Sequence, residues 1–333
     1  MGMGVDLRAA SLRADGLFRL ADQITGHPIS ELCAQGPLEA LTKTEIAQTA
    51  IVVTSLAAAA LLEDLLGSAP SSVAAVAGHS VGEIAAMCWA GAIDAETAIR
   101  LIHERGRLMS RDSAGCDGAM AAVLGLDHVR LAEICSAAST NAGRVQVANI
   151  NAPGQVVISG DRGALNAVAD LALGAGARRV VPLVVGGPFH SDYMAPAAAD
   201  FRCTLEGVSF RTPRVPIVLN TSAEPSTDPT TFADELAKQI VSPVCWEQSL
   251  QTMARMGCET FIELGAGQVL SGLVRRTLPD AHVYAAGTTE SVSEVASLWN
   301  PLAPSRQPLS RSQGRLSPRG RGGPSGTATG SAS

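Results

Sequence analysis

Hydrophobic and polar positions follow two different periods along most of the chain. Short apolar runs with the character of strands, such as 73–77, are followed by segments in which apolar residues recur every three or four positions, as on one face of a helix. One predicted helix runs from Val81 to Ala90 and stops at Gly91, and the next is capped by Asp94 and runs to about Ser110. Alternation of this kind is typical of an α/β fold with a mainly parallel sheet.

Between residues 114 and 185 the elements become shorter and follow another order. We expect a strand at 119–124, a helix after Asp127, a hairpin through 145–150 and 155–159, a helix after Asp161 and a strand at 178–185. This β-α-β-β-α-β order is the ferredoxin-like pattern. The sequence therefore predicts a small ferredoxin-like domain at 114–185. It is inserted into a larger α/β domain formed by 1–113 and 186–300, with further strands at 215–219 and 260–264.

The longest apolar run extends from Ala50 to Leu62 and contains Thr54 and Ser55. It is shorter than the roughly 18 residues that a membrane span needs, so we expect a buried helix and no membrane contact. The N-terminus shows no export signal, which makes the cytoplasm the expected location. From 301 onward arginines are spaced among Ser, Gly and Pro without any acidic residue, which predicts a disordered basic tail at 301–333.

Composition narrows the class of protein further. The 333 residues are 46% hydrophobic and 17% charged, which is typical of a globular chain with a large core. The net charge of −6 argues against a nucleic-acid partner. The seven cysteines are scattered and never form a C-x-x-C pair, which argues against a disulfide framework and against a zinc site.

The segment Gly78-His79-Ser80-Val81-Gly82 has the form of a nucleophile elbow. Gly and Ser are frequent in this chain, so the spacing alone is weak evidence, but a strand-like run precedes it and a helix-like segment follows. Ser80 would then stand at a helix N-terminus, where the Val81 N–H points toward a developing oxyanion. The alternative is a serine that only caps a helix after a strand.

Two further residues are candidates for chemistry. His190 follows a predicted strand and a Gly-Gly-Pro turn, and so lies where open α/β sheets place their sites; a structural or surface histidine fits the pattern equally. Arg105 shares a helix stripe with the apolar residues Ile102 and Met109, and a charge placed there needs an anionic partner. That partner is either an internal carboxylate such as Glu83 or the carboxylate of a substrate.

Six segments together resemble one family, the malonyl-CoA:acyl-carrier-protein transacylases of bacterial fatty-acid biosynthesis, which are related to acyltransferase domains of polyketide synthases. The resemblance covers about residues 1 to 290. The segments are Gly78-His79-Ser80-Val81-Gly82-Glu83, Glu104-Arg105-Gly106, Asn149 to Val157, Pro188-Phe189-His190-Ser191, Gln239 with Ser242-Pro243-Val244, and Glu263-Leu264-Gly265-Ala266-Gly267.

The resemblance implies a catalytic role for four residues. Ser80 would be the nucleophile that takes the malonyl group, and His190 the base that activates it. The imidazole would be oriented by a main-chain carbonyl at the position of Gln239, and the Val81 N–H would be one oxyanion donor. The family uses no cofactor and no metal, because malonyl-CoA is a substrate and the phosphopantetheine is carried by the partner.

The resemblance also implies a substrate pocket, a partner and a fold. Arg105 would bind the malonyl carboxylate, Asn149 would line the pocket, and the ring of Phe189 would favour malonyl over methylmalonyl. The partner would be an acidic acyl carrier protein, for which Arg178, Arg179, Arg275 and Arg276 are candidate docking charges. The implied fold is a hydrolase-like α/β domain with a ferredoxin-like insertion, and we expect a monomer.

The beginning of the chain departs from the family pattern. Family members start with a strand and a Gly-Gln-Gly-Ser-Gln loop, whose glutamine N–H completes the oxyanion hole, whereas this sequence aligns from Met1 just after that loop. We expect the natural start to lie upstream. Two other functions stay open: a serine acyl hydrolase or thioesterase, and an inactive truncated relative that only binds carrier protein or coenzyme A.

Overall fold

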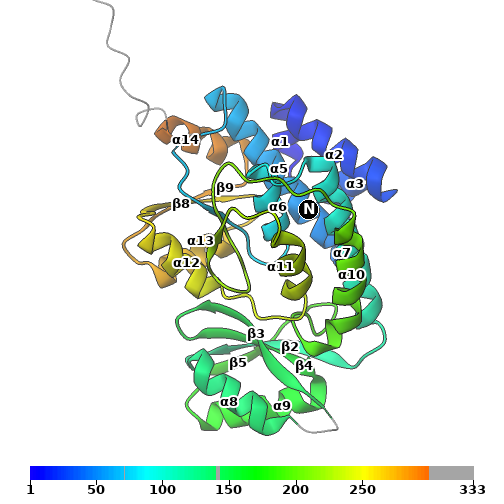
Figure 1. Cartoon of the computed structure of the whole chain (residues 1–333), viewed down its shortest axis with the longest axis vertical. Coiled ribbons are helices and arrows are strands. Elements are labelled where there is room, and N and C mark those ends of the chain that lie inside the picture. Colours follow the sequence, from blue (N-terminus) through cyan, green and yellow to red (C-terminus); the bar gives the residue numbers. More distant parts are fainter. Residues whose placement is uncertain (71, 140–142, 300–333) are drawn as a thin grey trace, which may run out of the picture.

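A computed structural model describes residues 1–70, 72–139 and 143–299 of the chain (Figure 1). The helices are α1 (Val5–Ala10), α2 (Leu12–Thr25), α3 (Ile29–Gln35), α4 (Leu38–Leu41), α5 (Thr44–Leu66), α6 (Gly82–Trp89), α7 (Ala95–Ser113), α8 (His128–Ala138), α9 (Arg162–Gly174), the short 3-10 helix η1 (Asp192–Met194), α10 (Ala195–Glu206), α11 (Phe232–Gln239), α12 (Trp246–Arg255), α13 (Val269–Thr277) and α14 (Thr289–Trp299). The strands are β1 (Val76–Ala77), β2 (Gly118–Leu124), β3 (Val145–Ala152), β4 (Gln155–Asp161), β5 (Arg179–Pro182), β6 (Ile217–Val218), β7 (Pro225–Ser226), β8 (Thr260–Leu264) and β9 (His282–Ala286).

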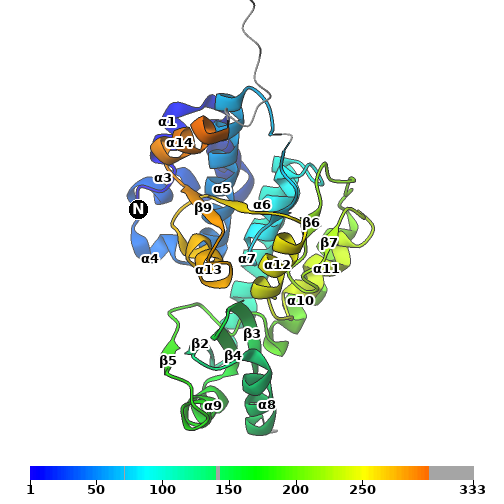
Figure 2. The same cartoon turned by 90° about the vertical axis from the view of Figure 1, so that its left-hand side faces the viewer.

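The larger part of the molecule contains two short sheets surrounded by helices (Figures 1 and 2). β1 pairs with β6 in parallel, Val76 opposite Ile217, and β7 continues this sheet in the antiparallel sense. β8 and β9 form a separate parallel pair. The strands are shorter than the sequence predicted, since 73–77 contributes only β1 and 215–219 only β6, whereas the strand predicted at 260–264 is present in full.

The strands β2 to β5 form a four-stranded antiparallel sheet in the order β3-β4-β2-β5, the order of a ferredoxin-like sheet. α8 and α9 pack on it, and Leu131 and Val168 are completely buried between helices and strands. Figure 1 shows this unit below the rest of the molecule. The predicted β-α-β-β-α-β order is present, although the last strand, predicted at 178–185, is limited to β5.

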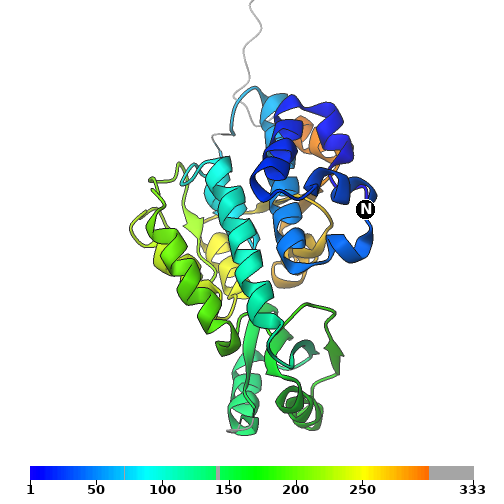
Figure 3. The same cartoon turned by 90° about the vertical axis from the view of Figure 1, so that its right-hand side faces the viewer.

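The apolar run predicted as a buried helix is the centre of α5, which is longer than the run itself. With 23 residues, α5 is long and apolar enough to cross a membrane, so the length argument from the sequence was wrong. However, 67% of its most apolar stretch is buried inside the protein, where α5 contacts α2, α7 and α14 (Figure 3). α5 is therefore placed as a core helix. The tail predicted at 301–333 lies outside the described residues.

Candidate active site

The segment around Ser80 is a sharp strand-to-helix turn between β1 and α6. Ser80 has φ +49°, a left-handed conformation that costs a non-glycine residue roughly 1–2 kcal/mol. The turn is also tight, because a Cβ on Gly78 would lie 1.9 Å from the Gly82 carbonyl oxygen. A strained serine at the carboxyl end of a parallel strand is the geometry of a nucleophile elbow, not that of an ordinary helix cap.

His190 completes a hydrogen-bonded chain that starts at this serine. Ser80 Oγ lies 2.8 Å from His190 Nε2, and His190 Nδ1 lies 2.8 Å from the main-chain oxygen of Gln239. The second contact requires the proton on Nδ1, which leaves Nε2 free to accept from the hydroxyl. Burial, assisted by the positive charge of Arg105, lowers the pKa of His190 to about 3. The imidazole is therefore neutral at physiological pH and able to accept a proton.

Arg105 reaches the same oxygen from α7. Its guanidinium donates to Ser80 Oγ at 3.0 Å, to Gln239 Oε1 at 2.8 Å and to Gln48 Oε1 at 2.6 Å, while the side chain is only 1% exposed. All three acceptors are uncharged, and burial lowers the pKa of Arg105 only to about 10, so the charge persists. Within the described residues Arg105 forms no ion pair, so the internal partner considered from the sequence, Glu83, does not bond to it.

Glu83 has a different place in the site. Its carboxylate accepts from Asn220 N at 2.8 Å and from Gln239 Nε2, and burial raises its pKa to about 7. Gln239 Nε2 also donates to the Ser80 main-chain oxygen at 3.0 Å. By contrast, the Val81 N–H at the start of α6 has no hydrogen-bond partner among the described residues. It is available to a negatively charged oxygen beside Ser80.

With this geometry established, comparison with known proteins identifies the family. A family model described as "Acyl transferase domain" matches residues 1–301. The chain belongs to this acyl transferase family. It is 37% identical over 276 residues to the malonyl CoA-acyl carrier protein transacylase of Bacillus subtilis (strain 168), which covers 83% of this chain and 86% of that protein. The transacylase of Escherichia coli (strain K12) is also 37% identical over 276 residues, covering 83% and 88%.

Solved structures agree with the family assignment. An acyl-carrier-protein-S-malonyltransferase from Bartonella henselae superposes with a TM-score of 0.85 at 34% identity, covering 90% of this chain and 95% of that one. A malonyl-transacylase in complex with a type II PKS acyl-carrier protein gives 0.84 at 32% identity, covering 90% and 95%. The predicted fold class, a hydrolase-like α/β domain with a ferredoxin-like insertion, is confirmed by these likenesses.

The structure of this acyl transferase brings four of the candidate residues together, namely Ser80, His190, Arg105 and Gln239, with Val81 next to Ser80. Phe189 is half-buried and contacts two apolar clusters, one around α7 and one on the sheet of residues 118–182. Asn149 is 6% exposed on β3 and pairs with Val244 through the backbone. No hydrogen bond in the described part of the chain joins Asn149 or Phe189 to Ser80.

Three side chains that the sequence analysis missed also support the acyl transferase site. Gln48 is a buried amide on α5, two residues before the long apolar run that begins at Ala50. Asn220 follows the predicted strand at 215–219, and the rule that sites lie at carboxyl ends of parallel strands could have found it. Asn151 Oδ1 lies 2.8 Å from His79 Nε2, and no local signal distinguishes Asn151 from its neighbours on β3.

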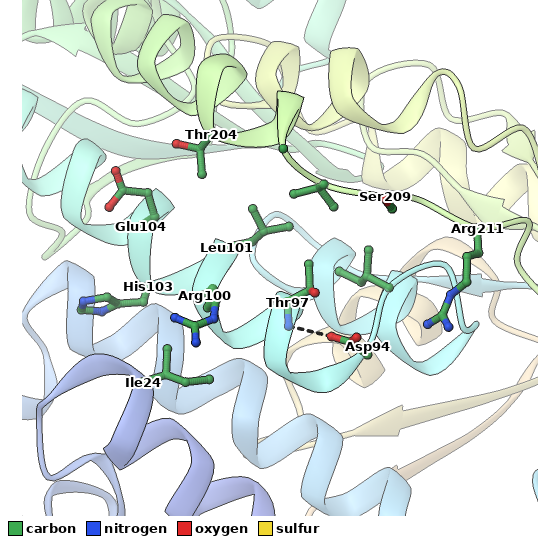
Figure 4. A pocket seen from close by; sticks show the side chains of 13 residues that line it. Ile24, Asp94, Thr97, Arg100, Leu101, His103, Glu104, Thr204, Ser209 and Arg211 are labelled. Carbon is green, nitrogen blue, oxygen red and sulfur yellow. Dashed lines mark hydrogen bonds between the residues drawn. The ribbon is translucent and has the colours of Figure 1, made fainter.

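A groove of about 740 Å³ lies on the other side of α7, between this helix and α10 (Figure 4). Glu104 and His103 line it, and Asp94 and Thr97 are hydrogen-bonded at its edge. Arg105, the residue next to Glu104, is instead turned into the interior toward Ser80. The groove is therefore separate from the site of the acyl transferase.

Proposed function

We propose that this acyl transferase moves a malonyl group from coenzyme A, through an ester on Ser80, to the phosphopantetheine thiol of an acyl carrier protein. One observation carries the proposal: Ser80 Oγ lies within hydrogen-bond distance of both a neutral imidazole and a buried guanidinium with uncharged partners. The first provides a base for acyl transfer and the second a site for a free carboxylate. The names of the relatives support the same substrate and acceptor.

The first half of the reaction forms the ester. His190 Nε2 accepts the hydroxyl proton while Ser80 Oγ attacks the thioester carbonyl. The Val81 N–H and the N-terminal end of α6 stabilise the negative charge that develops on the carbonyl oxygen. The carbon–sulfur bond then breaks, and the imidazolium returns the proton to the sulfur of coenzyme A. The Gln239 carbonyl keeps the imidazole in the tautomer that this step requires.

The second half repeats these steps with a new thiol. His190 accepts the proton of the carrier thiol, the sulfur attacks the ester carbonyl, and Ser80 Oγ leaves with the proton. A thioester is replaced by a thioester, so the overall free-energy change is small and the enzyme mainly has to exclude water from the ester. Burial of His190, which is 4% exposed, supports that exclusion.

Arg105 supplies the specificity for a dicarboxylic acyl group in this proposal. A guanidinium binds a carboxylate with two parallel hydrogen bonds, which are stronger than those to its neutral amide partners. An acetyl group cannot make this contact and would leave the buried charge without an anion. Phe189 and Asn149 remain proposed pocket residues, Phe189 because its ring would crowd a substituent on the α-carbon of the malonyl group.

The carrier protein is proposed to dock on arginines at the edge of the site. Arg178, Arg179, Arg275 and Arg276 are all exposed, and none has an ion-pair partner in the described part of the chain. Arg276 Nε donates to the main-chain oxygen of Pro153 at 3.1 Å.

Arg178 lies near the same turn, next to Gly125. Its Cγ would be 2.8 Å from a Cβ on Gly125, whose N–H donates to Gly154 O at 2.8 Å. This turn connects β3 and β4, and β3 carries Asn151, the hydrogen-bond partner of His79. The two arginines therefore lie near a turn that leads to the neighbourhood of Ser80, and together they form a basic surface suited to an acidic carrier.

The proposal also covers the domain boundaries, the cellular location and the oligomeric state of the chain. We place the domain boundaries at 1–113 with 186–300 and at 114–185, because the sheet of β2 to β5 draws all its strands from 118–182. The enzyme is proposed to be a cytoplasmic monomer that needs no cofactor and binds neither nucleic acid nor a membrane. The burial of α5 and the net charge of −6 support the last two points.

Intact-mass spectrometry after brief incubation with malonyl-CoA tests the function. We expect a malonyl adduct that is absent from Ser80→Ala and that disappears when carrier protein with its pantetheine thiol is added. Net hydrolysis of malonyl-CoA without carrier would instead indicate a serine hydrolase or thioesterase. Binding of carrier or coenzyme A by the folded chain without any adduct on Ser80 would indicate a relative that only binds.

A further inference from the structure

One side-chain amide holds the backbone of the Ser80 turn on both sides. Asn220 Nδ2 donates to the Gly78 carbonyl oxygen at 2.8 Å, and Asn220 Oδ1 accepts from the Ser80 N–H at 2.7 Å. One of these backbone groups is an acceptor and the other a donor. A side chain at this position must therefore offer a donor and an acceptor side by side, as an amide does.

The sheet brings Asn220 to this place and fixes it there. Ala77 pairs with Val218 across β1 and β6, so both strands end at the same edge, with the elbow beyond one strand and Asn220 beyond the other. The Asn220 N–H donates to Glu83 Oε1 at 2.8 Å, its carbonyl accepts from Cys245 N at 2.8 Å, and it is 1% exposed. Every polar group of the residue is thus engaged, which makes the amide a rigid support.

We propose that Asn220 is a positioning residue for the nucleophile, holding Ser80 in its left-handed conformation so that Oγ stays in reach of His190. Asn220 acts through the backbone of the turn, because its side chain bonds to Gly78 O and Ser80 N and, at the longer distance of 3.5 Å, to Gln239 Nε2, but not to Oγ. Because Asn220 Oδ1 accepts from the Ser80 N–H, this N–H is not free to bind a substrate oxygen. The Val81 N–H, which has no partner among the described residues, is. The inference rests on the proposed role of Ser80 as nucleophile.

The test measures the reactivity of Ser80 in two variants. Asn220→Leu removes both hydrogen bonds at similar volume, and Asn220→Asp keeps an acceptor for the Ser80 N–H but, when ionised, has no donor for Gly78 O. The probes are malonyl-CoA and a fluorophosphonate; with the latter, Oγ forms a bond to phosphorus, fluoride leaves and His190 takes the proton. We expect both rates to fall about 10- to 100-fold, the usual effect of a misplaced reacting group.

A binding measurement separates positioning from general damage. In a Ser80→Ala background, adding Asn220→Leu or Asn220→Asp should leave the affinity for malonyl-CoA unchanged, because Arg105 is held by Gln48 and Gln239. Thr221→Val is the matched control: it removes the neighbouring side-chain hydrogen bond to Glu235, which involves no residue of the elbow. This variant should acylate like the wild type.

The pH profile of Asn220→Asp gives a readout that loss of packing would not produce. When protonated, the carboxyl group has an O–H for Gly78 O beside an acceptor for Ser80 N, so the rate with the fluorophosphonate should recover as the pH falls from about 8 to about 5. The pKa of His190 is held near 3, so the base stays neutral over this range. The other ionisable groups around the turn, Glu83, His79 and Arg105, are also present in the wild type and in Asn220→Leu, which should show no recovery.

Three results would overturn the proposal. They are wild-type rates in folded Asn220→Leu and Asn220→Asp, an equal loss in Thr221→Val, and a rate for Asn220→Asp that does not recover at low pH. Failure of the proposed function looks different: the fluorophosphonate would still react with Ser80 in a manner dependent on Asn220, but malonyl-CoA would leave no adduct.

Discussion

At the scale of single residues, the buried charge of Arg105 is the feature on which the proposed substrate selectivity rests. A guanidinium that is 1% exposed normally has a carboxylate partner, yet the hydrogen bonds of Arg105 go to Gln48, Gln239 and Ser80. Such a site is poised to bind an anion, and the acyl group attached to Ser80 Oγ would place its free carboxylate within reach. In the proposed function, selectivity for a charged acyl group follows from the lack of a direct counter-ion for Arg105 among the described residues.

Arg105→Ala should therefore reduce malonyl transfer more than acetyl transfer. We expect a loss of roughly 100-fold or more in kcat/KM for malonyl-CoA, since truncating one member of a buried charge pair costs about 2–5 kcal/mol. The loss for acetyl-CoA should be smaller and reflect only the contact with Ser80 Oγ. Arg107→Ala is the control, because Arg107 lies two residues further along α7 and pairs with Glu104 on the surface. Equal losses for both acyl groups would remove Arg105 from the substrate site.

At the scale of elements, local signals in the sequence predicted where certain helices begin better than how far the strands extend. Asp94 caps a helix as predicted, and Asp127 and Asp161 cap the helices predicted to follow them; the three carboxylates accept from backbone N–H groups at 2.8, 2.9 and 3.1 Å. A cap depends on neighbours three residues away, whereas the extent of a strand depends on a distant partner. β1 is therefore two residues long although 73–77 is uniformly strand-like, because only Val76 and Ala77 meet β6.

The contrast between features set by neighbours in the sequence and features set by distant partners also explains how much of the site could be predicted. The elbow at Ser80 could be predicted because its glycines and the following helix are adjacent in the sequence. Asn220 is 140 residues away, and although its place after a predicted strand marks it as a candidate, only the parallel pairing of β1 with β6 shows that it contacts the Ser80 turn. The partners of Arg105 were left open for the same reason: they come from α5 and α11, which no periodicity places beside α7.

The two glycines of the elbow should respond differently to substitution. A Cβ on Gly78 would lie 1.9 Å from Gly82 O and 2.5 Å from Glu83 N, whereas a Cβ on Gly82 would meet nothing within 4 Å. Gly78→Ala should therefore open the turn, lower stability by about 1–3 kcal/mol or more and abolish most acylation of Ser80. Gly82→Ala should acylate normally and stabilise α6 slightly, because alanine is the better helix former. Urea unfolding and the rate of malonyl-ester formation check both, and equal behaviour of the two variants would contradict this assignment.

At the scale of the whole molecule, the exposed arginines proposed for carrier docking differ from many others in having no ion-pair partner among the described residues. The chain carries a net charge of −6, and many exposed arginines are in ion pairs, such as Arg100 with Glu96 and Arg130 with Glu133. Arg178 and Arg276 have no such partner among the described residues. They come from different parts of the fold, the residue before β5 and helix α13, and both lie near the turn after β3. A carrier that docks there would contact both parts of the fold at once.

Reversing these two charges should impair only the half-reaction that uses the carrier. In Arg178→Glu with Arg276→Glu, ester formation from malonyl-CoA should keep its rate, while kcat/KM for the carrier should fall about 10-fold or more, because like charges face each other across the interface. Added salt should weaken transfer in the wild type but much less in the variant. Transfer to free pantetheine, which has the thiol but no acidic protein, should be unchanged.

Arg211→Glu provides the matched control for this double variant. Arg211 is also exposed and without an ion pair in the described structure, but it lies at the groove between α7 and α10, away from α13 (Figures 1 and 4). It should leave both half-reactions intact. If the double variant slowed ester formation as much as transfer, the arginines would serve the phosphates of coenzyme A instead. If neither step changed, the carrier would have to dock on another face, and the two charges would have no part in its recognition.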